Sequence, residues 1–513
     1  MLLFCRLNDS QSEPTAQLLN RARTAHRPRF LSALSVCELE YAAIEFRARR
    51  NGGMNELISE VRATLLSNFH GDLLSPGHPD FEEARRVWNA MVARKPALIA
   101  RCADTTDIQN AVRAAATAGV LAAIRCGGHS LGGFSTCEDG LVIDLSRLRD
   151  ISVDEHGKRA RFGGGCLLGT IDTATQKVGL AFPSGVVSHT GAAGLVLGGG
   201  TGWLNRLHGL SCDNVEGFTL VVADGSLVRA NAKQNPDLFW ALRGGGGNFG
   251  VVTEFEVRLH PVTSVLFGAG YCIGDDLAAI VRRWRDFMPH APDNLRWGIS
   301  LTTAPSSASV SPHLRGRPVA SQGLVWVGDR DEGNRYLHRA LSFCDCQAAT
   351  QREMSFLELQ TMADHEFPHG RRYYTKSGYF RSLGDSEIAR MVAALETIPS
   401  PVDQIELAYL GGAAGRVGAS ETAFGDRGSP FIANVLGNWS EASDDAANVA
   451  WVRKLFADLR PAMTPGAYVN FMSGDEQDRV PEAYRERWGR LVTIKTHYDP
   501  NNFFRLNQNI PPQ

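Results

Sequence analysis

The stretch RCGGHSLGGF, residues 125–134, decides how the rest of the chain is interpreted. It follows an apolar run, Ala118 to Ile124, that predicts a short buried strand. Its four glycines let the backbone approach a ligand closely, and successive backbone N–H groups in such a loop suit a phosphate. The imidazole of His129 in its middle points to a tightly held nucleotide cofactor. Taken alone, an ordinary glycine-rich turn with a surface histidine explains the stretch equally well.

Three further glycine-rich segments follow along the chain. They are GGG at 163–165, FPSGVVSHTGAAGLVLGGGTGW at 182–203 and GGGGNFG at 244–250. The longest has no helix or strand period, which is unusual inside a core. It makes sense if a flat, rigid ligand takes the place of the missing side chains. A mobile linker is the alternative, but glycine linkers lack the interspersed leucines and valines found here.

Length and composition are those of a globular protein with two or three domains. The 513 residues carry a formal net charge of −2, which gives no strong attraction to nucleic acid or anionic membranes. No apolar run is long enough for a membrane-spanning helix. The 10 cysteines lack metal-binding spacing, because Cys344 and Cys346 are too close together and have no second half. We therefore expect a reduced, cytoplasmic protein.

The glycine clusters stop after Pro261. Before it, the pattern predicts strands at 95–101, 119–124, 140–145 and 251–259, helices at 106–118 and 168–178, and a hairpin of 218–222 with 227–230. A capping box at Thr106–Gln109 would start the first helix. After it, the pattern predicts helices at 277–288, 388–395, 449–459 and 481–498, and strands at 296–301, 323–327, 405–409 and 431–439. A sheet with helices on one side is typical of an α+β domain.

The order of the motifs resembles that of flavin-linked oxidases whose FAD domain is of the p-cresol methylhydroxylase or vanillyl-alcohol-oxidase type. Within them it is similar to the berberine-bridge-enzyme branch. The matching segments are residues 125–130, 185–203, 213–214, 244–252, 468–471 and 498–512. The resemblance implies an α+β fold, with a two-part FAD-binding domain and a substrate domain in which helices cover an antiparallel sheet.

A domain layout also follows from the resemblance. It implies an FAD-binding domain at 54–262, a substrate-binding domain at 263–460, and a C-terminal segment at 461–513 that returns to the FAD domain. Residues 1–53 would then be an N-terminal extension, which could be disordered or could precede the native start of translation.

FAD is the cofactor that the resemblance implies, and no metal. His129 matches the position whose ring is bonded to the 8α-methyl group of FAD, and a neutral imidazole is a competent nucleophile for that bond. The backbone of 126–130 would bind the pyrophosphate, while Tyr468 and Asn470 would border the isoalloxazine. The full set of implied cofactor residues is Arg125, Cys126, Gly127, Gly128, His129, Ser130, Phe134, Ser188, Gly191, Gly194, Leu195, Gly198, Gly199, Gly202, Asp213, Asn214, Gly250, Val252, Tyr468, Asn470 and Asn509.

The chain departs from the family pattern at three positions. Members with two covalent bonds carry a cysteine where this chain has Val187, so we expect a single attachment through His129. Phe471 stands where other members have a second tyrosine, and Asp426 stands where a histidine is common.

The catalytic base stays open among Tyr468, Glu406, Glu421 and Tyr374. Glu406 and Glu421 lie on or after a predicted strand of the substrate domain, whose sheet covers the flavin in the family. Alternatively, either carboxylate is a solvated surface group, which is the commoner role of an acidic side chain. Tyr374 could equally be a core residue.

The resemblance implies an FAD-dependent oxidase acting on an alcohol or amine carbon of a small molecule, such as a sugar, a natural product or a cyclic amine. Hydride would move to flavin N5, and O₂ would be reduced to H₂O₂. A dehydrogenase with another electron acceptor and a non-catalytic flavin-binding protein are the alternatives. A Rossmann NAD enzyme is disfavoured, because no single GxGxxG motif opens a helix after the first strand. The expected partners are the substrate and O₂, without nucleic acid or membrane.

Overall fold

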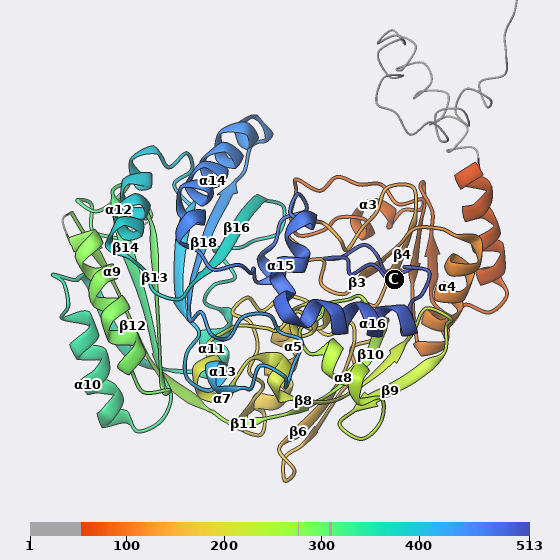
Figure 1. The fold of residues 1–513 in the computed structure, drawn as a ribbon, viewed down its shortest axis with the longest axis horizontal. Helices are drawn as coiled ribbons and strands as arrows, with labels where there is room; N and C mark the ends of the chain where they lie inside the picture. The colour runs from red at the N-terminus through yellow and green to blue at the C-terminus, as the bar shows by residue number, and fades with distance from the viewer. Residues whose placement is uncertain (1–52, 275, 307–309) are drawn as a thin grey trace, which may run out of the picture. The chain divides into compact units, whose positions relative to one another are not determined.

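Four β-sheets organise the chain in the computed structural model, which describes residues 53–274, 276–306 and 310–513 (Figure 1). Leu57–Gln513 form one compact unit. The predicted N-terminal extension lies, apart from residue 53, outside the described residues. None of the described helices is long and apolar enough to cross a membrane. The predicted domain boundaries stay predictions, and the sheets are described one by one below.

A small four-stranded sheet presents the loop at 125–134. Its strands run in the order β1-β2-β4-β3, and β2, β4 and β3 are parallel. Helix α4 (Thr105–Ala118) makes the crossover from β2 to β3. Its N-cap is Asp104, whose carboxylate accepts from the Asp107 N–H, so the capping box predicted at Thr106 is wrong. The strands are β1 (Asp72–Leu74), β2 (Leu98–Arg101), β3 (Ala122–Arg125) and β4 (Leu141–Asp144), and the short helix α3 (Phe81–Ala84) precedes β2.

A five-stranded antiparallel sheet forms the second half of this region, in the order β5-β6-β10-β8-β9. The predicted hairpin is confirmed as β8 and β9, joined at Gly225 with φ +78°. Phe255 and Val257 on β10 are buried while Glu254 is exposed, as the alternation predicts. The strands are β5 (Ile151–Asp154), β6 (Arg159–Gly163), β8 (Val215–Val221), β9 (Leu227–Asn231) and β10 (Val251–Arg258).

Short elements connect these two sheets. The segment 182–203 was predicted to have no regular structure, yet it contains the six-residue helix α6 (Ala192–Leu197). Its alanines and leucines favour a helix once the surrounding core is in place. The other elements are α5 (Leu168–Gln176), β7 (Leu180–Ala181), α7 (Asn205–His208), the 3₁₀ helix η1 (Ser211–Asn214), α8 (Pro236–Leu242) and β11 (His260–Pro261), where β11 pairs with β7.

A seven-stranded antiparallel sheet follows, in the order β15-β12-β14-β13-β17-β18-β16. Helices α9, α10, α12 and α14 pack on one face, at the left and top in Figure 1, so the α+β expectation is confirmed. The strands are β12 (Ser264–Ile273), β13 (Leu295–Thr303), β14 (Pro318–Trp326), β15 (Gln347–Ser355), β16 (Arg372–Phe380), β17 (Gln404–Tyr409) and β18 (Phe431–Trp439). The helices of this region are α9 (Asp276–Phe287), η2 (Met288–His290), α10 (Arg330–Leu341), α11 (Phe356–Thr361), α12 (Asp385–Ala394), η3 (Leu395–Thr397), α13 (Ala413–Arg416), η4 (Ala442–Asp444), α14 (Asp445–Leu459) and η5 (Arg460–Ala462).

Strand β16 was not predicted, because its sequence RYYTKSGYF carries charges that suggest exposure. The structure pairs those charges with groups distant in sequence. The Arg372 guanidinium contacts the Asp445 carboxylate at 2.5 Å, and the Lys376 ammonium contacts Asp475 at 2.9 Å. Paired in this way, charged side chains are tolerated in a strand that is otherwise buried.

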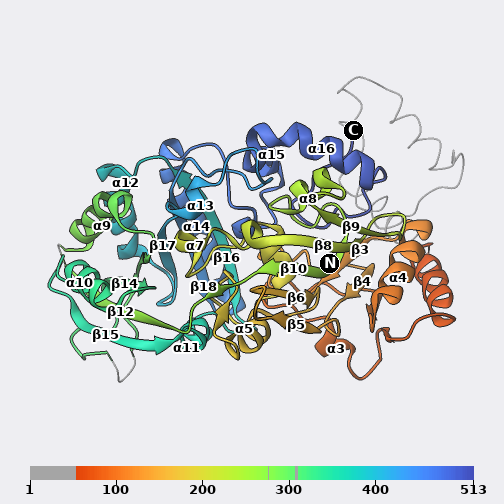
Figure 2. The ribbon, with the colours of Figure 1, turned by 90° about the horizontal axis from the view of Figure 1, so that it is seen from below.

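The C-terminal segment returns to the glycine-rich loops. One helix was predicted at 481–498, but the structure has α15 (Val480–Tyr484), η8 (Arg485–Arg487) and α16 (Trp488–Tyr498), preceded by η6 (Val469–Phe471) and η7 (Gln477–Arg479). The break lies at Arg485, whose φ is +54° and whose guanidinium pairs with Asp426 at 2.6 Å. Helix α16 packs beside α8 in both views (Figures 1 and 2).

One disulfide joins Cys272 to Cys344. This differs from the expectation that every cysteine is reduced, since a disulfide is typical of oxidising compartments. Because β12 carries Cys272 and the turn after α10 carries Cys344, the bond links two elements that sequence spacing could not bring together. The cytoplasmic location stays a prediction, and this bond does not support it.

Candidate active site

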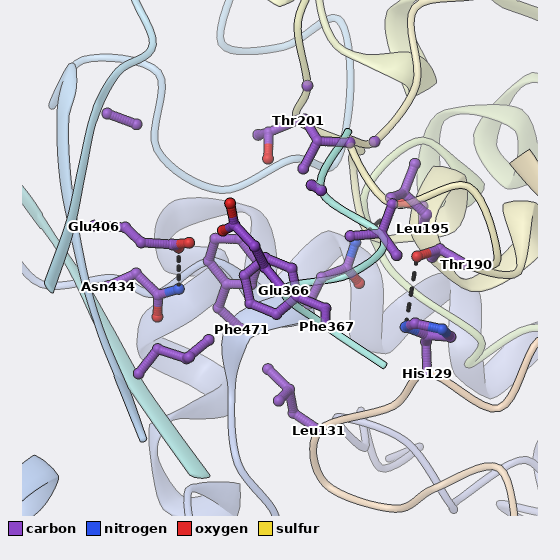
Figure 3. Close-up of a pocket in the computed structure, with 18 of the residues that line it drawn as sticks. His129, Leu131, Thr190, Leu195, Thr201, Glu366, Phe367, Glu406, Asn434 and Phe471 are labelled. Carbon is purple, nitrogen blue, oxygen red and sulfur yellow. Dashed lines mark hydrogen bonds between the residues drawn. The ribbon is translucent and has the colours of Figure 1, made fainter. Parts of the chain in front are cut away.

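A cavity of about 1250 Å³ lies between the glycine-rich loops and the seven-stranded sheet. Drug-sized ligands occupy pockets of about 300–1,000 Å³, so there is room for a dinucleotide with a small substrate beside it. His129 and Thr190 lie at one end in Figure 3, and Glu406 and Asn434 lie at the other. Glu366, Phe367 and Phe471 lie between the two ends.

The loop end of the cavity has the properties of a phosphate cradle. The backbone N–H groups of residues 128–131 have no hydrogen-bond partner among the described residues. Unpaired N–H groups in succession form a concave anion site. The loop is held against α6, because a Cβ at Gly127 would lie 2.3 Å from the Gly191 nitrogen. At Gly194, by contrast, a Cβ would meet nothing within 4 Å, since that side faces the cavity.

His129 lies beside this cradle in an apolar and aromatic setting. Its ring stacks on Trp88, with centroids 4.9 Å apart and planes 17° apart. Its Nε2 lies 2.7 Å from Nδ1 of His189, and its Nδ1 lies 3.5 Å from the hydroxyl of Thr190. Burial, followed by the neighbouring imidazoles of His189 and His369, lowers the pKa of His129 well below its usual value. The ring is therefore neutral at pH 7 and keeps a free lone pair for nucleophilic attack.

Glu406 is the acidic group of the opposite end. It lies on β17, directly across from Asn434 on β18, whose amide nitrogen donates to the carboxylate at 2.8 Å. The Gln404 side chain donates to the other carboxylate oxygen at 3.2 Å. Burial raises the pKa of Glu406, Asn434 lowers it, Glu366 raises it and Arg296 lowers it, with a net upward shift. A carboxylate with a raised pKa inside a cavity is a candidate general base.

Two further charged groups share this end. Glu366 lines the cavity from the loop after α11, and its side chain is exposed to that space. The protein around it still removes water from the carboxylate, and this burial raises the pKa of Glu366. Arg296 on β13 lies over the Trp203 ring at 4.7 Å from the centroid. Burial lowers the pKa of Arg296 to about 10, so the guanidinium remains charged at pH 7.

The C-terminal segment supplies the floor between the two ends. The Tyr468 hydroxyl accepts from the Gly200 N–H at 3.0 Å and from the Asn470 amide at 3.0 Å. The Asn470 amide also donates to the Leu195 carbonyl at 3.0 Å, which ties η6 to α6. The aromatic ring of Phe471 packs edge-on against that of Tyr468.

The structure brings most of the predicted cofactor residues to one cavity wall. This wall contains Cys126, Gly127, Gly128, His129, Ser130, Phe134, Gly191, Gly194, Leu195, Gly202, Gly250, Val252, Tyr468 and Asn470. The row of unpaired N–H groups and the open space at Gly194 fit a flavin dinucleotide. Which of these residues touch FAD stays a prediction.

Other predicted cofactor residues do not line the cavity, and their contact with FAD stays a prediction. Arg125 donates to the Ala84 carbonyl, and the Ser188 hydroxyl donates to Asp364 at 2.6 Å. Asp213 forms a buried ion pair with Arg427 at 2.6 Å. The predicted cofactor residues outside the cavity lining are Arg125, Ser188, Gly198, Gly199, Asp213, Asn214 and Asn509.

Two of the four candidate bases lie away from the cavity. Glu421 is exposed and its backbone carbonyl accepts from Arg243. The Tyr374 hydroxyl donates to Asp475 at 2.7 Å, outside the cavity wall. Neither side chain lines this cavity, whereas Glu406 and Tyr468 do.

Sequence reasoning missed several cavity residues. They are Trp88, Thr190, Arg296, Glu366, Phe367, Asn434, Asn507 and Gln508. Asn434 could have been found from strand register, because it lies opposite Glu406 on the next strand. Glu366 lies in an irregular loop, where no periodic pattern marks which side chain faces inward.

Filling the cradle should displace the flavin without unfolding the chain. We expect Gly194→Leu to lower the FAD content of the purified protein at least about tenfold, since the new side chain would occupy the cavity as a ligand would. Gly489→Leu in α16 is the matched control, because a Cβ there also meets nothing within 4 Å but points to solvent. The ratio of absorbance at about 450 nm to that at 280 nm reports the FAD content. Equal ratios in both variants would show that FAD does not lie against α6.

Comparison with known proteins matches two regions of the chain to families, one in the FAD-binding part and one at the C-terminus. Residues 96–231 match a family model described as an FAD binding domain, and residues 467–511 match one described as berberine and berberine like. An uncharacterized FAD-linked oxidoreductase of Bacillus subtilis is 32% identical over 449 residues, covering 86% of this chain and 97% of that protein. The (R)-6-hydroxynicotine oxidase of Paenarthrobacter nicotinovorans is 30% identical over 477 residues, covering 89% and 100%.

Solved structures agree with the fold. The crystal structure of 6-hydroxy-D-nicotine oxidase from Arthrobacter nicotinovorans superposes with a TM-score of 0.78 at 28% identity, covering 87% of this chain and 99% of that one. A berberine-bridge-enzyme-like protein of Physcomitrella patens gives a TM-score of 0.80 at 24% identity, covering 88% and 99%, and shows the fold alone. With these similarities over nearly its whole described length, the chain belongs to the berberine-bridge-enzyme-like FAD-linked oxidoreductases, and its cofactor is FAD.

Proposed function

We propose that this protein is an FAD-dependent oxidase that oxidises an alcohol or amine carbon of a small molecule and reduces O₂ to H₂O₂. One observation carries the proposal: a partly buried carboxylate, Glu406, and a glycine cradle with His129 line the same cavity. Two relatives support it by their names, (R)-6-hydroxynicotine oxidase and the tetrahydroberberine oxidase of Berberis wilsoniae. Bound FAD would supply the hydride acceptor.

Glu406 is assigned as the general base. As a carboxylate it would take the proton from the substrate O–H or N–H while the adjacent carbon loses hydride. Asn434 and Gln404 hold the carboxylate in one orientation, so little reorganisation is needed on substrate binding. Tyr468 is less suited to this task, because burial raises its phenol pKa and its oxygen already accepts two hydrogen bonds.

Arg296 and Glu366 would orient the substrate. Arg296 keeps a positive charge near Glu406, which limits the rise of the Glu406 pKa. Glu366 faces the same space from the opposite loop, so a substrate amine or hydroxyl could bridge the two carboxyl groups. The aromatic rings of Trp203, Tyr409 and Phe471 complete the wall.

A covalent bond between His129 and FAD is the second part of the proposal. We expect acid precipitation of the purified protein to leave the yellow colour in the pellet, because the flavin would be bonded to the denatured chain. Intact mass should rise by one FAD, and Val187 rules out a thioether at the position where bicovalent members carry cysteine. His129→Ala should retain its colour before acid and release all of it into the supernatant. A colourless pellet from the unaltered protein would contradict the bond.

A panel of sugars, alkaloids and cyclic amines is first used to find a substrate that reduces the flavin. The electron acceptor is then identified by how the reduced flavin is reoxidised. An oxidase bleaches at about 450 nm under anaerobic conditions with its substrate and recovers rapidly in air with release of H₂O₂. Slow recovery in air with fast reduction of a dye would indicate a dehydrogenase instead. Failure of the whole panel to bleach the flavin would favour a non-catalytic flavin-binding protein.

A further inference from the structure

Three imidazoles gather beside the predicted attachment point. The rings of His129 and His189 have centroids 4.8 Å apart, and His369 lies 5.4 Å from His129 and 4.8 Å from His189. His129 and His189 are partly buried, whereas His369 is exposed. Neither His189 nor His369 lines the cavity, so they stand behind His129 as seen from the ligand.

One hydrogen bond fixes the protonation pattern of this group. Nε2 of His129 and Nδ1 of His189 lie 2.7 Å apart, so one of the two nitrogens carries the shared hydrogen. Nδ1 of His129 is not part of this contact, lies beside Thr190 of the cavity wall, and must keep its lone pair to attack a ligand. We therefore assign Nε2–H of His129 as the donor and Nδ1 of His189 as the acceptor.

This assignment leaves the lone pair of His129 on Nδ1. That atom lies 3.5 Å from the Thr190 hydroxyl, and Thr190 lines the cavity. Nδ1 is therefore the nitrogen that can attack a ligand, while Nε2 is held by His189. Burial lowers the pKa of His189, and the nearby Asp364 carboxylate partly opposes this shift.

We propose that His189 accepts the Nε2 proton of His129 while Nδ1 of His129 bonds to the 8α-carbon of FAD. This inference rests on the covalent attachment proposed above. The C–N bond forms, one methyl C–H bond and the imidazole N–H bond break, and the two electrons stay on the flavin ring. Dioxygen then takes the two electrons with two protons and leaves as H₂O₂. Without a proton acceptor, attack would place a positive charge on His129 in an environment that disfavours it.

His189 acts through His129, so it is a positioning and proton-accepting residue for attachment and has no role in substrate oxidation. The exposed His369 is the matched control: it is an imidazole next to both rings, but no hydrogen bond joins it to His129 among the described residues.

The test measures the covalent fraction of flavin. In His189→Ala we expect FAD to bind but the fraction retained in the acid pellet to fall at least about tenfold, because loss of a general base slows proton transfer about 10²- to 10⁴-fold. Adding imidazole in air to this variant should restore slow attachment, because the free base can enter the vacated space. His189→Gln should lose attachment as well but resist rescue, since its side chain fills that space. His369→Ala should attach as the unaltered protein does.

Three other outcomes would contradict either the role of His189 or the covalent bond. Full attachment in both His189 variants, with FAD bound, would overturn the inference but leave the covalent bond intact. No attachment in the unaltered protein would instead refute the proposed bond itself. Stoichiometric zinc in the unaltered protein would assign the three histidines to a metal site and overturn the inference, because metal-bound imidazoles cannot accept the proton.

Discussion

Replacing Glu406 by glutamine is expected to lower the rate constant of flavin reduction by substrate about 10²- to 10⁴-fold, the usual loss when a general base is removed. Glutamine keeps the size and one of the two acceptor oxygens that Asn434 and Gln404 donate to, so flavin content should change little. Anaerobic stopped-flow at about 450 nm measures the rate directly, and the substrate is the one that the panel identifies.

The pH dependence of the rate of flavin reduction is a second test of Glu406 as the base. The pKa of Glu406 is raised by burial, and the group works as a base only when ionised, so the rate should rise with pH through that pKa and then level off. In Glu406→Gln the rate should no longer rise with pH in this range. Glu421→Gln is the matched control, because that carboxylate is exposed and does not line the cavity, and its rate should stay unchanged. A Glu406→Gln rate within twofold of the unaltered protein would refute the assignment and direct attention to Tyr468.

The cofactor side of the site was largely predictable because its signal is local. Glycines are required where two backbones approach closely, as at Gly127 and Gly191, and such clusters are visible in the sequence itself. The substrate side was not predictable to the same degree. Glu406 and Asn434 meet only through strand pairing, and Glu366 reaches the cavity from an irregular loop. Pairing between strands far apart in the chain leaves no mark in a window of a few residues.

The same distinction explains the errors in the fold. Amphipathic helices such as α9 and α14 were predicted, since one face alone packs on the sheet. Strand β16 was missed because Arg372 and Lys376 are neutralised by Asp445 and Asp475, which lie 73 and 99 residues further along the chain. Hydrophobic periodicity does not reveal such distant pairs. The break at Arg485 likewise depends on its pairing with Asp426.

Loss of the buried ammonium of Lys495 should be the most destabilising single change considered. Its side chain is 0% exposed and donates to Asp499 at 2.5 Å, the Asn248 carbonyl at 2.8 Å and the Phe504 carbonyl at 3.0 Å. Lys495→Met would leave the Asp499 carboxylate buried without a cation, which costs about 3–5 kcal/mol of the free energy of unfolding. Denaturant unfolding followed by tryptophan fluorescence measures the loss.

Flavin binding should also weaken in this variant, because Lys495 anchors the C-terminal tail, whose residues Asn507 and Gln508 line the cavity. The Asn248 amide donates to the Gln508 carbonyl at 3.0 Å, and the Asn507 amide donates to the Gly247 carbonyl at 3.1 Å, so the tail and the 244–250 loop hold each other. Lys495→Met should therefore also bind FAD less tightly. Lys454→Met is the matched control: Lys454 makes the same i,i+4 ion pair, with Asp458 at 3.0 Å, but is 80% exposed, so it should cost about 0.5 kcal/mol or less. Similar losses of stability in the two variants would mean that the Lys495–Asp499 pair does not anchor the tail.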